Sequence, residues 1–253
     1  MPAGQKPNFT IPIKCCICGQ TLHGQYVTNL FGDVYCARHG NAYPSCYSCG
    51  RPIASGTTGG GARYADGREV CAVCRKTAVD SESAALSILR EVRQTLAKIG
   101  LDVNHPEIQP KLAGRETLLR LAAERGFDLV SLEGITETIK YTDGKRQIGF
   151  IYILDGLPRQ HTAAIMAHEI GHAWLFLHEF PILSLMTEEG ICELWAARWL
   201  EMQNTPLAKH RLQIMAKNPD PVYGDGYRAA LKALRGRTVP GLLERVRRGH
   251  GFF

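Results

Sequence analysis

The sequence contains no long apolar run, and this absence excludes whole classes of protein. No apolar stretch approaches the roughly eighteen residues that a membrane-spanning helix needs. The start of the chain, MPAGQKPNFTIPIK, lacks the apolar segment of a secretory signal, so we expect a cytoplasmic protein without membrane contact. Of the 253 residues, 45% are hydrophobic and 21% are charged, which excludes wholesale disorder, a collagen helix and a coiled-coil rod.

Clustered positive charge is scarce in the N-terminal part of the chain. The net charge of +6 at pH 7 is a mild excess, which permits an acidic partner without requiring one. Residues 15–78 contain few Lys and Arg and no basic helix suited to a DNA groove. We therefore do not expect nucleic acid as a partner.

Cysteine, by contrast, is concentrated in one region. The chain has nine cysteines, and eight of them lie within the first 74 residues. An odd total without a secretion signal argues against a disulfide scaffold. It favours thiolates that bind metal in a reducing compartment.

Two similar segments follow one another in this region. The first reads CCICGQTLHG and then GDVYCARH, and the second reads CYSCGRPIASG and then DGREVCAVC. Each offers four ligands for a closed tetrahedral site, which is the chemistry of structural zinc. The predicted ligands are Cys15, Cys18, Cys36 and His39 for one zinc ion, and Cys46, Cys49, Cys71 and Cys74 for a second.

The order of these ligands leaves their connectivity open. It also suits a cross-brace, in which ligand pairs alternate between two ions. A duplicated unit should close its own site, so we predict two sequential fingers. Cys16 remains as a packing residue or a spare thiol, and the glycine-rich stretch 55–62 predicts a mobile hairpin loop.

From residue 79 the periodicity predicts mostly helices. They are expected over about 81–100, 116–126, 159–180, 187–202, 225–235 and 239–248. RQIGFIYIL (146–154) predicts a β-strand. We expect an α+β protein, divided into a tail (1–14), a tandem finger module (15–78), a helical connector (79–128) and a mostly helical catalytic domain with a small sheet (129–253).

His168, Glu169 and His172 form an H-E-x-x-H motif inside one predicted helix. The two histidines are four residues apart, so both imidazoles project from one face and can hold one Zn²⁺. Zinc lowers the pKa of a bound water to about 7, and Glu169 is placed to accept its proton as the water attacks a carbonyl. A helix whose histidines make ordinary contacts is the alternative, but buried histidines need partners.

The segment TEEGICELWAARWL offers a third ligand. Glu189 and Glu193 are four residues apart and share a helix face. We predict that Glu189 binds the metal and that Glu193 accepts the N–H of a ligand histidine, with Glu188 as the alternative ligand. Two histidines, one glutamate and a water leave the open position that catalysis needs.

Two further roles concern the substrate. An extended peptide could pair with the edge of the strand at 146–154, unless that strand is internal to its sheet. A peptide hydrolase also needs a donor to the tetrahedral oxyanion. Tyr223, in VYGDGYR, is the expected donor, and Tyr227, His178 and His210 are weaker candidates.

Three stretches together resemble a known family. ILDGLPRQHTAAIMAHEIGHAWL, EEGICELWAARWL and VYGDGYRAA, with the paired fingers, are similar to the plant growth-limiting, ubiquitin-activated LIM-domain peptidases (the DA-one type) and their bacterial relatives. The resemblance implies a gluzincin-like zinc metallopeptidase behind LIM-like fingers, with His168, His172 and Glu189 on the metal and Glu169 as base. HEIGH replaces the plant HEMMH, and neither a first LIM domain nor ubiquitin-interacting helices precede the fingers. Ubiquitin therefore stays an open partner.

The sequence thus predicts a zinc-dependent endopeptidase with one catalytic and two structural zinc ions. Its expected partners are protein or peptide substrates, and the fingers would recruit a substrate or partner or regulate the cleft. Two other functions stay open. One is a non-catalytic adaptor or ligase-like zinc protein, and the other is a zinc amidase that acts on a small molecule.

Overall fold

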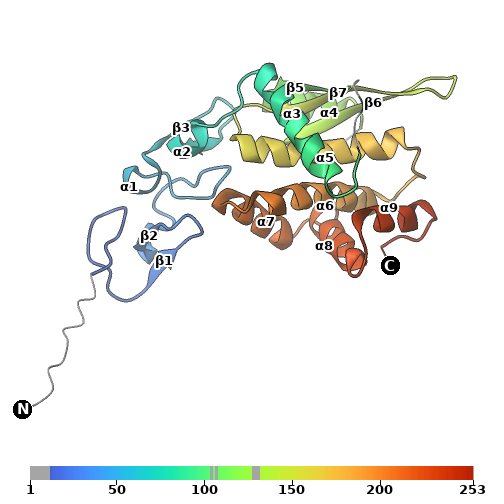
Figure 1. The fold of residues 1–253 in the computed structure, drawn as a ribbon. Coiled ribbons are helices and arrows are strands. Elements are labelled where there is room, and N and C mark those ends of the chain that lie inside the picture. The colour runs from blue at the N-terminus through green and yellow to red at the C-terminus, as the bar shows by residue number, and fades with distance from the viewer. Residues whose placement is uncertain (1–11, 103–104, 106–107, 127–131, 253) are drawn as a thin grey trace, which may run out of the picture.

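The computed structural model describes residues 12–102, 105, 108–126 and 132–252, which form two unequal parts (Figure 1). The first part consists of two small cysteine-rich units at one end of the molecule. The second is a larger body of helices around a small sheet. Residues 1–11 of the expected tail lie outside the described residues.

Each cysteine-rich unit contains a short antiparallel hairpin and a turn of helix. Finger 1 (residues 15–39) contains β1 (Tyr26–Thr28), β2 (Val34–Cys36) and η1 (Ala37–His39), and finger 2 (residues 46–74) contains α1 (Ser55–Thr58), β3 (Gly61–Arg63), β4 (Glu69–Cys71) and most of α2 (Ala72–Arg75). Both hairpins end on a ligand-type cysteine, because Cys36 pairs with Tyr26 and Cys71 pairs with Gly61. The repeat in the sequence is therefore also a repeat in the structure.

The glycine-rich stretch 55–62 is not a mobile hairpin loop, so that prediction is wrong. Residues 55–58 form α1, and residues 61–62 pair with β4. Thr57 is buried, and its hydroxyl donates to the Pro52 carbonyl at 2.5 Å. Such side-chain-to-backbone bonds fix a segment whose glycine content alone indicates conformational freedom.

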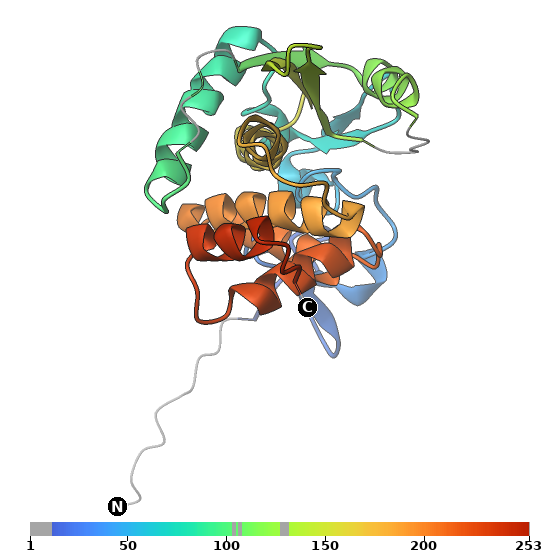
Figure 2. The same cartoon turned by 90° about the vertical axis from the view of Figure 1, so that its right-hand side faces the viewer.

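The body is an α+β arrangement in layers, as the sequence indicated. In chain order it contains α3 (Glu82–Ala97), β5 (Gln109–Ala113), α4 (Arg115–Ala123), β6 (Gly134–Lys140), β7 (Arg146–Leu154), α5 (Arg159–Leu177), α6 (Leu185–Gln203), α7 (Pro206–Lys217), α8 (Tyr223–Leu234) and α9 (Val239–Arg247). Figure 2, which looks along α5, shows α5 between the sheet above it and the layer of α6, α8 and α9 below it.

The sheet has the strand order β5-β7-β6, so β7 is its central strand among the described residues. β7 pairs in parallel with β5 and antiparallel with β6. Over residues 151–153 this strand has a partner on both sides, so it is internal to its sheet and the expected pairing of a peptide along its edge is wrong there. The two edge strands of this sheet are β5 and β6, and the sequence analysis identified neither of them.

α5 lies between the sheet and the layer that contains α6, and both helices are buried because they are apolar on most of their surface. Among others, Met166, Ile170 and Trp195 are fully buried, and helices that are apolar all round lie inside a protein. The Ser184 hydroxyl accepts the N–H of Thr187, so α6 begins at Leu185 rather than at the predicted Thr187. α5 and α6 pack side by side, which sets the geometry of the site.

One hydrophobic core runs through the body from Val79 to Phe252. Residues 109–113 lie in the segment expected to be a helical connector, yet they form β5 and pair with β7. That segment is therefore not purely helical, and it shares the hydrophobic core of the body. No helix in the described ranges is long and apolar enough to cross a membrane.

Candidate metal centre and cleft

The eight predicted finger ligands gather into two clusters. Each cluster brings four ligand atoms within 4.8 Å of one another, and the grouping is sequential: Cys15, Cys18, Cys36 and His39, then Cys46, Cys49, Cys71 and Cys74. The sulfurs of Cys18 and Cys36 are 3.9 Å apart, and those of Cys49 and Cys71 are 3.8 Å apart. Four sulfurs at about 2.3 Å from one zinc ion would be about 3.8 Å apart. Both clusters could therefore hold zinc.

Unsatisfied atoms and turn geometry support this interpretation. Nε2 of His39 is buried without a hydrogen-bond partner among the described residues, which costs free energy unless a metal or another group fills the position. Gly19 and Gly50 follow the C-x-x-C pairs and have φ values of 73° and 66°. This left-handed conformation favours glycine and turns the backbone sharply behind the two sulfurs.

α5 and α6 bring together the three side chains predicted to hold the third metal. His168 Nε2 and His172 Nε2 are 3.2 Å apart, and Glu189 Oε2 lies 3.2 Å from the first nitrogen and 3.5 Å from the second. Tetrahedral ligands at 2.0–2.1 Å from one zinc ion would be about 3.3–3.4 Å apart. The three atoms therefore form a triangle of the size that one zinc ion requires.

The electrostatics of this triangle favour a cation. Oε2 of Glu189 is buried, and no group in the described part of the chain gives it a hydrogen bond. Burial would raise the pKa of Glu189, but the two imidazoles outweigh burial and hold that pKa well below its usual range. Burial would also lower the pKa of His168, yet Glu189 and Glu193 raise it. Because Glu189 is held ionised beside the two imidazoles, these residues fit a bound zinc ion.

The other nitrogen of each ring meets a carboxylate. His168 Nδ1 is 3.1 Å from Glu193 Oε1, and His172 Nδ1 is 2.9 Å from Glu188 Oε1. Such pairs hold the tautomer that leaves Nε2 free for a metal. Glu193 thus contacts the Nδ1 atom of a histidine predicted to bind the metal, which is the contact that the sequence analysis expected. Glu188, the alternative ligand in the sequence analysis, instead supports the ring of His172.

Cys192 lies against the same centre and was not predicted. Its sulfur is within 4.8 Å of ligand-type nitrogens of His168 and His172. Burial raises the pKa of its thiol, whereas metals bind the thiolate, so the ionised Glu189 is the better third ligand. Its position three residues after Glu189, on the same helix face, is the signal that could have identified it.

Glu169 faces the edge strand β6. The Thr136 hydroxyl lies 2.8 Å from Glu169 Oε2, and a Cβ added at Gly134 would lie only 2.6 Å from Glu169 Oε1. Burial raises the pKa of Glu169, although the neighbouring histidines and Thr136 oppose this effect. Thr136 and Gly134 were missed because their contacts depend on strand pairing, which the local sequence does not encode.

A cleft of about 890 Å³ opens over this centre and is lined in part by β6. Tyr223 also lines the cleft, with its ring centroid 6.4 Å from that of His168. Burial raises the pKa of Tyr223, so its hydroxyl stays protonated and able to donate at neutral pH. The weaker candidates Tyr227, His178 and His210 are not among the described residues that line this cleft.

These sites define a class of protein with two closed four-ligand clusters and one open centre of two histidines and a glutamate beneath a cleft. Residues 116–217, which include that centre, match the family model DA1-like: Protein DA1. The chain is therefore related to the DA1-like proteins. No solved structure matches it at a significant level.

Curated relatives agree with this relation. Protein DA1 of Arabidopsis thaliana is 28% identical over 273 residues, which cover 84% of this chain and 50% of that protein. Protein DA1-related 7 of the same plant is 30% identical over 228 residues, which cover 75% of this chain and 39% of that protein. LIM domain-containing protein HDR3 of Oryza sativa subsp. japonica is 24% identical over 315 residues, which cover 94% of this chain and 62% of that protein. The chain thus spans 39–62% of the length of these three relatives.

Proposed function

We propose that this protein is a zinc-dependent peptidase that cleaves peptide bonds inside polypeptide substrates. The observation that carries the proposal is the triangle of His168 Nε2, His172 Nε2 and Glu189 Oε2, which opens to a cleft beside the carboxylate of Glu169. A closed four-ligand site has no position for a substrate, whereas three protein ligands leave one.

His168, His172 and Glu189 would hold the catalytic zinc, and the two finger clusters would each hold a structural zinc. When bound at the open centre, zinc acidifies a water and polarises a carbonyl oxygen. Glu193 and Glu188 orient the two imidazoles through their Nδ1 atoms. The protein groups thereby fix the position of the metal before a substrate arrives.

The remaining groups of the chain handle the proton and the substrate. Glu169 is buried and oriented by Thr136, and its raised pKa makes it a stronger base for accepting a proton from the attacking water. Tyr223 would donate a hydrogen bond to the oxyanion that develops on the carbonyl. The edge of β6 could pair with an extended backbone, which favours a polypeptide over a small amide.

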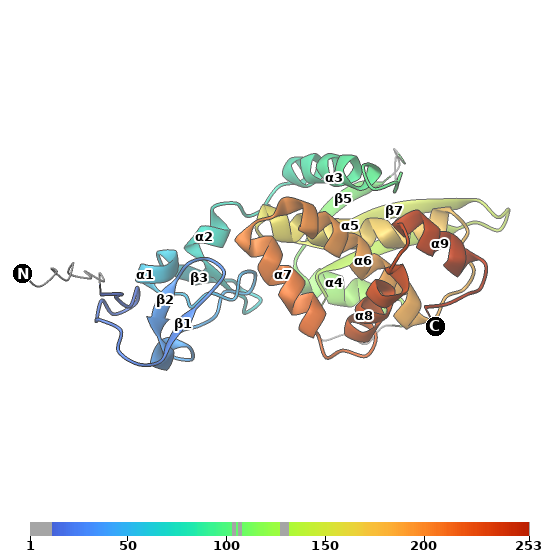
Figure 3. The ribbon, with the colours of Figure 1, turned by 60° about the horizontal axis from the view of Figure 1, so that its bottom comes forward.

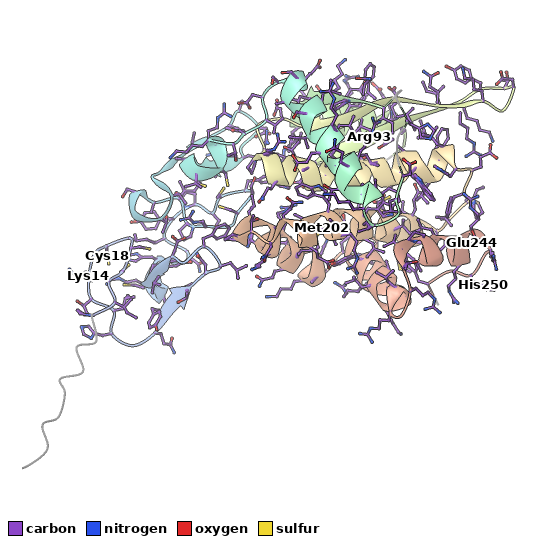
Figure 4. All side chains as sticks on the ribbon, viewed as in Figure 1. Lys14, Cys18, Arg93, Met202, Glu244 and His250 are labelled. Atoms are coloured by element: carbon purple, nitrogen blue, oxygen red, sulfur yellow. The ribbon has the colours of Figure 1, made fainter. Side chains whose placement is uncertain are left out.

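Zinc content and cleavage of an internally quenched peptide library test this proposal on the full chain. We expect three zinc ions per chain, falling to two in His168→Ala. Glu169→Gln should keep three ions and lose about 10²–10⁴-fold in kcat/KM, as expected for removal of a general base. Glu244→Gln, an exposed acid on α9, is the control and should change neither quantity (Figure 4).

Two outcomes would overturn the assignment. One is cleavage by Glu169→Gln at the wild-type rate, which would show that the cleavage does not arise from the open centre and its carboxylate. The other is a wild-type chain that carries three zinc ions and cleaves nothing in the library.

A further inference from the structure

A group of apolar side chains lines one end of the cleft, where α5 ends and α6 begins. We call it the apolar rim, and it consists of Phe176, Phe180, Pro181, Ile182, Leu183 and Leu185. Ile182 is fully exposed and Leu185 is 51% exposed. Single exposed apolar residues are ordinary on protein surfaces, but a contiguous group beside a cleft marks a binding site.

The apolar rim begins one helical turn from the candidate metal ligands. On α5, Phe176 follows His172 by four residues, and on α6, Leu185 precedes Glu189 by four residues. Residues four apart lie on the same helix face, about 6 Å apart along the axis. The rim therefore continues the two helix faces that carry the metal-binding side chains.

The segment that carries the rim is held from two sides. Arg146, on β7, donates to the Phe176 carbonyl at 2.7 Å, and Arg247, on α9, donates to the His178 carbonyl at 2.8 Å. The Arg247 guanidinium also lies 4.7 Å from the centre of the Phe180 ring. These contacts fix the end of α5 and the Phe180 ring, from which the exposed part of the rim continues.

The opposite end of the cleft carries a charged pair among apolar side chains that include Leu132 and Ile214. Tyr47 of finger 2 lines it, together with Glu133 and Arg211, whose charged groups are 3.3 Å apart. The cleft thus carries exposed apolar groups at one end and a charged pair at the other. An occupant that fits both ends must itself carry different groups along its length, which a polypeptide does.

We propose that the apolar rim is a substrate subsite that takes a large apolar side chain next to the bond to be cleaved. The proposal rests on the proposed peptidase function. An extended peptide on the edge of β6 would form backbone hydrogen bonds and direct alternate side chains to the same side. One such side chain would cover Ile182 and Leu185 and remove their apolar surface from water.

The test uses pairs of internally quenched peptides that differ by Leu or Asn at a single position, cleaved by the full zinc-loaded chain. We expect the wild type to prefer Leu at one position by at least about tenfold in kcat/KM. The double variant with Ile182→Asn and Leu185→Asn should reduce this preference to about threefold or less, with peptides that carry Asn there cleaved as before. The control is Met202→Asn, because Met202 is 44% exposed on the same helix and does not line the cleft (labelled in Figure 4).

Zinc content and the unfolding midpoint of each variant show whether its fold is intact. Cleavage without any preference for an apolar side chain would overturn the subsite while leaving the peptidase function in place. A preference that survives in the double variant, or that Met202→Asn also removes, would overturn the subsite as well. A wild-type chain that cleaves no peptide would overturn the proposed function and, with it, this inference.

Discussion

Finger 1 and finger 2 carry the same arrangement of ligand-type side chains, but at very different depths. All four ligands of finger 2 are buried, whereas in finger 1 Cys15 is buried and Cys18 is exposed. Figure 3 shows both fingers at the end of the molecule remote from α9, and Figure 4 places Cys18 near Lys14 at the outer limit of finger 1. The same site is therefore built once inside the protein and once at its surface.

Finger 2 is joined to the body by buried polar contacts. Ser48, which lies inside its first C-x-x-C pair, has its hydroxyl 3.1 Å from His161 Nδ1 on α5. Nε2 of the same ring is 3.0 Å from Glu133, directly before β6. Ser48 and His161 are completely buried, and buried polar groups persist only when their partners are in place. Finger 2 thus depends on α5 and β6, and they depend on it.

A second link joins finger 2 to the central strand. The guanidinium of Arg68 donates to the carbonyl of Asp155 at 2.7 Å and pairs with its carboxylate at 3.0 Å. Asp155 directly follows β7. The Arg68 side chain is only 3% exposed, whereas that of Asp155 is 48% exposed, so solvent screens the ion pair and the bond to the carbonyl is the more protected of the two contacts.

Finger 1 makes a charged contact to finger 2 and an aromatic contact to α7. Asp33 forms two hydrogen bonds with Arg51 of finger 2, at 2.7 and 2.8 Å, and Phe31 packs 6.0 Å from the His210 ring of α7. The comparison teaches that ligand chemistry alone does not decide what a finger does for the fold. Burial and polar links make finger 2 part of the body, and finger 1 is an appended unit.

The largest difference should come from equivalent ligand substitutions in the two repeats. Zinc bound by a structural finger is worth about 10–16 kcal/mol in isolated peptides. We expect Cys49→Ser to lower the free energy of unfolding of the whole chain by at least about 4 kcal/mol, because its site is continuous with the body. Cys18→Ser should lose one zinc ion and leave the main unfolding transition nearly unchanged. Equal losses in denaturant unfolding of the two variants would contradict the comparison.

A smaller effect should follow from His161→Ala. This substitution leaves the four ligands of finger 2 in place, and it also leaves the candidate catalytic residues in place. It removes the partner of Ser48 and takes the imidazole away from the carboxylate of Glu133. We expect a loss of about 2–3 kcal/mol, together with reduced peptide cleavage, because Glu133 immediately precedes the strand that contacts Glu169. His23→Ala, at an exposed position of finger 1, is the control and should stay within about 0.5 kcal/mol of the wild type. An undiminished stability of His161→Ala would show that the buried contacts do not couple the two parts.

Features that depend on local pattern could be predicted from the sequence. The repeat predicts the grouping of the finger ligands. The run of β-branched and aromatic residues predicts the strand at 146–154. The H-E-x-x-H motif and its apolar surroundings predict the helix that carries His168 and His172. Features that depend on pairing between distant segments could not. β5 contains a proline and alternates poorly, and it is a strand because it pairs with β7.

Two features that the sequence analysis did not predict, the helix α7 and the position of Cys192, had a signal in the local sequence. α7 begins at Pro206, which suggests an interruption of the chain, yet proline is favoured in the first turn of a helix, and Thr205 caps it by accepting the N–H of Ala208. Cys192 stands one turn from Glu189 on the same helix. The contact of Thr136 with Glu169 had no such signal, because it follows from the position of β6 beside α5.

The smallest effect on the body should come from stripping finger 1 of its metal. A mercurial thiol reagent attacks accessible sulfur first, and Cys18 is the exposed ligand, whereas every ligand of finger 2 is buried. We expect the first zinc ion to be released together with modification of Cys18, as peptide mapping would show, while the body stays within about 0.5 kcal/mol of its starting stability. Modification of Cys49 or Cys71 before Cys18 would contradict the expected order, in which finger 1 loses its metal before finger 2. Because the reagent acts on an unmutated chain, agreement here would show that the contrast in burial, rather than a substituted side chain, makes the two metal sites unequal.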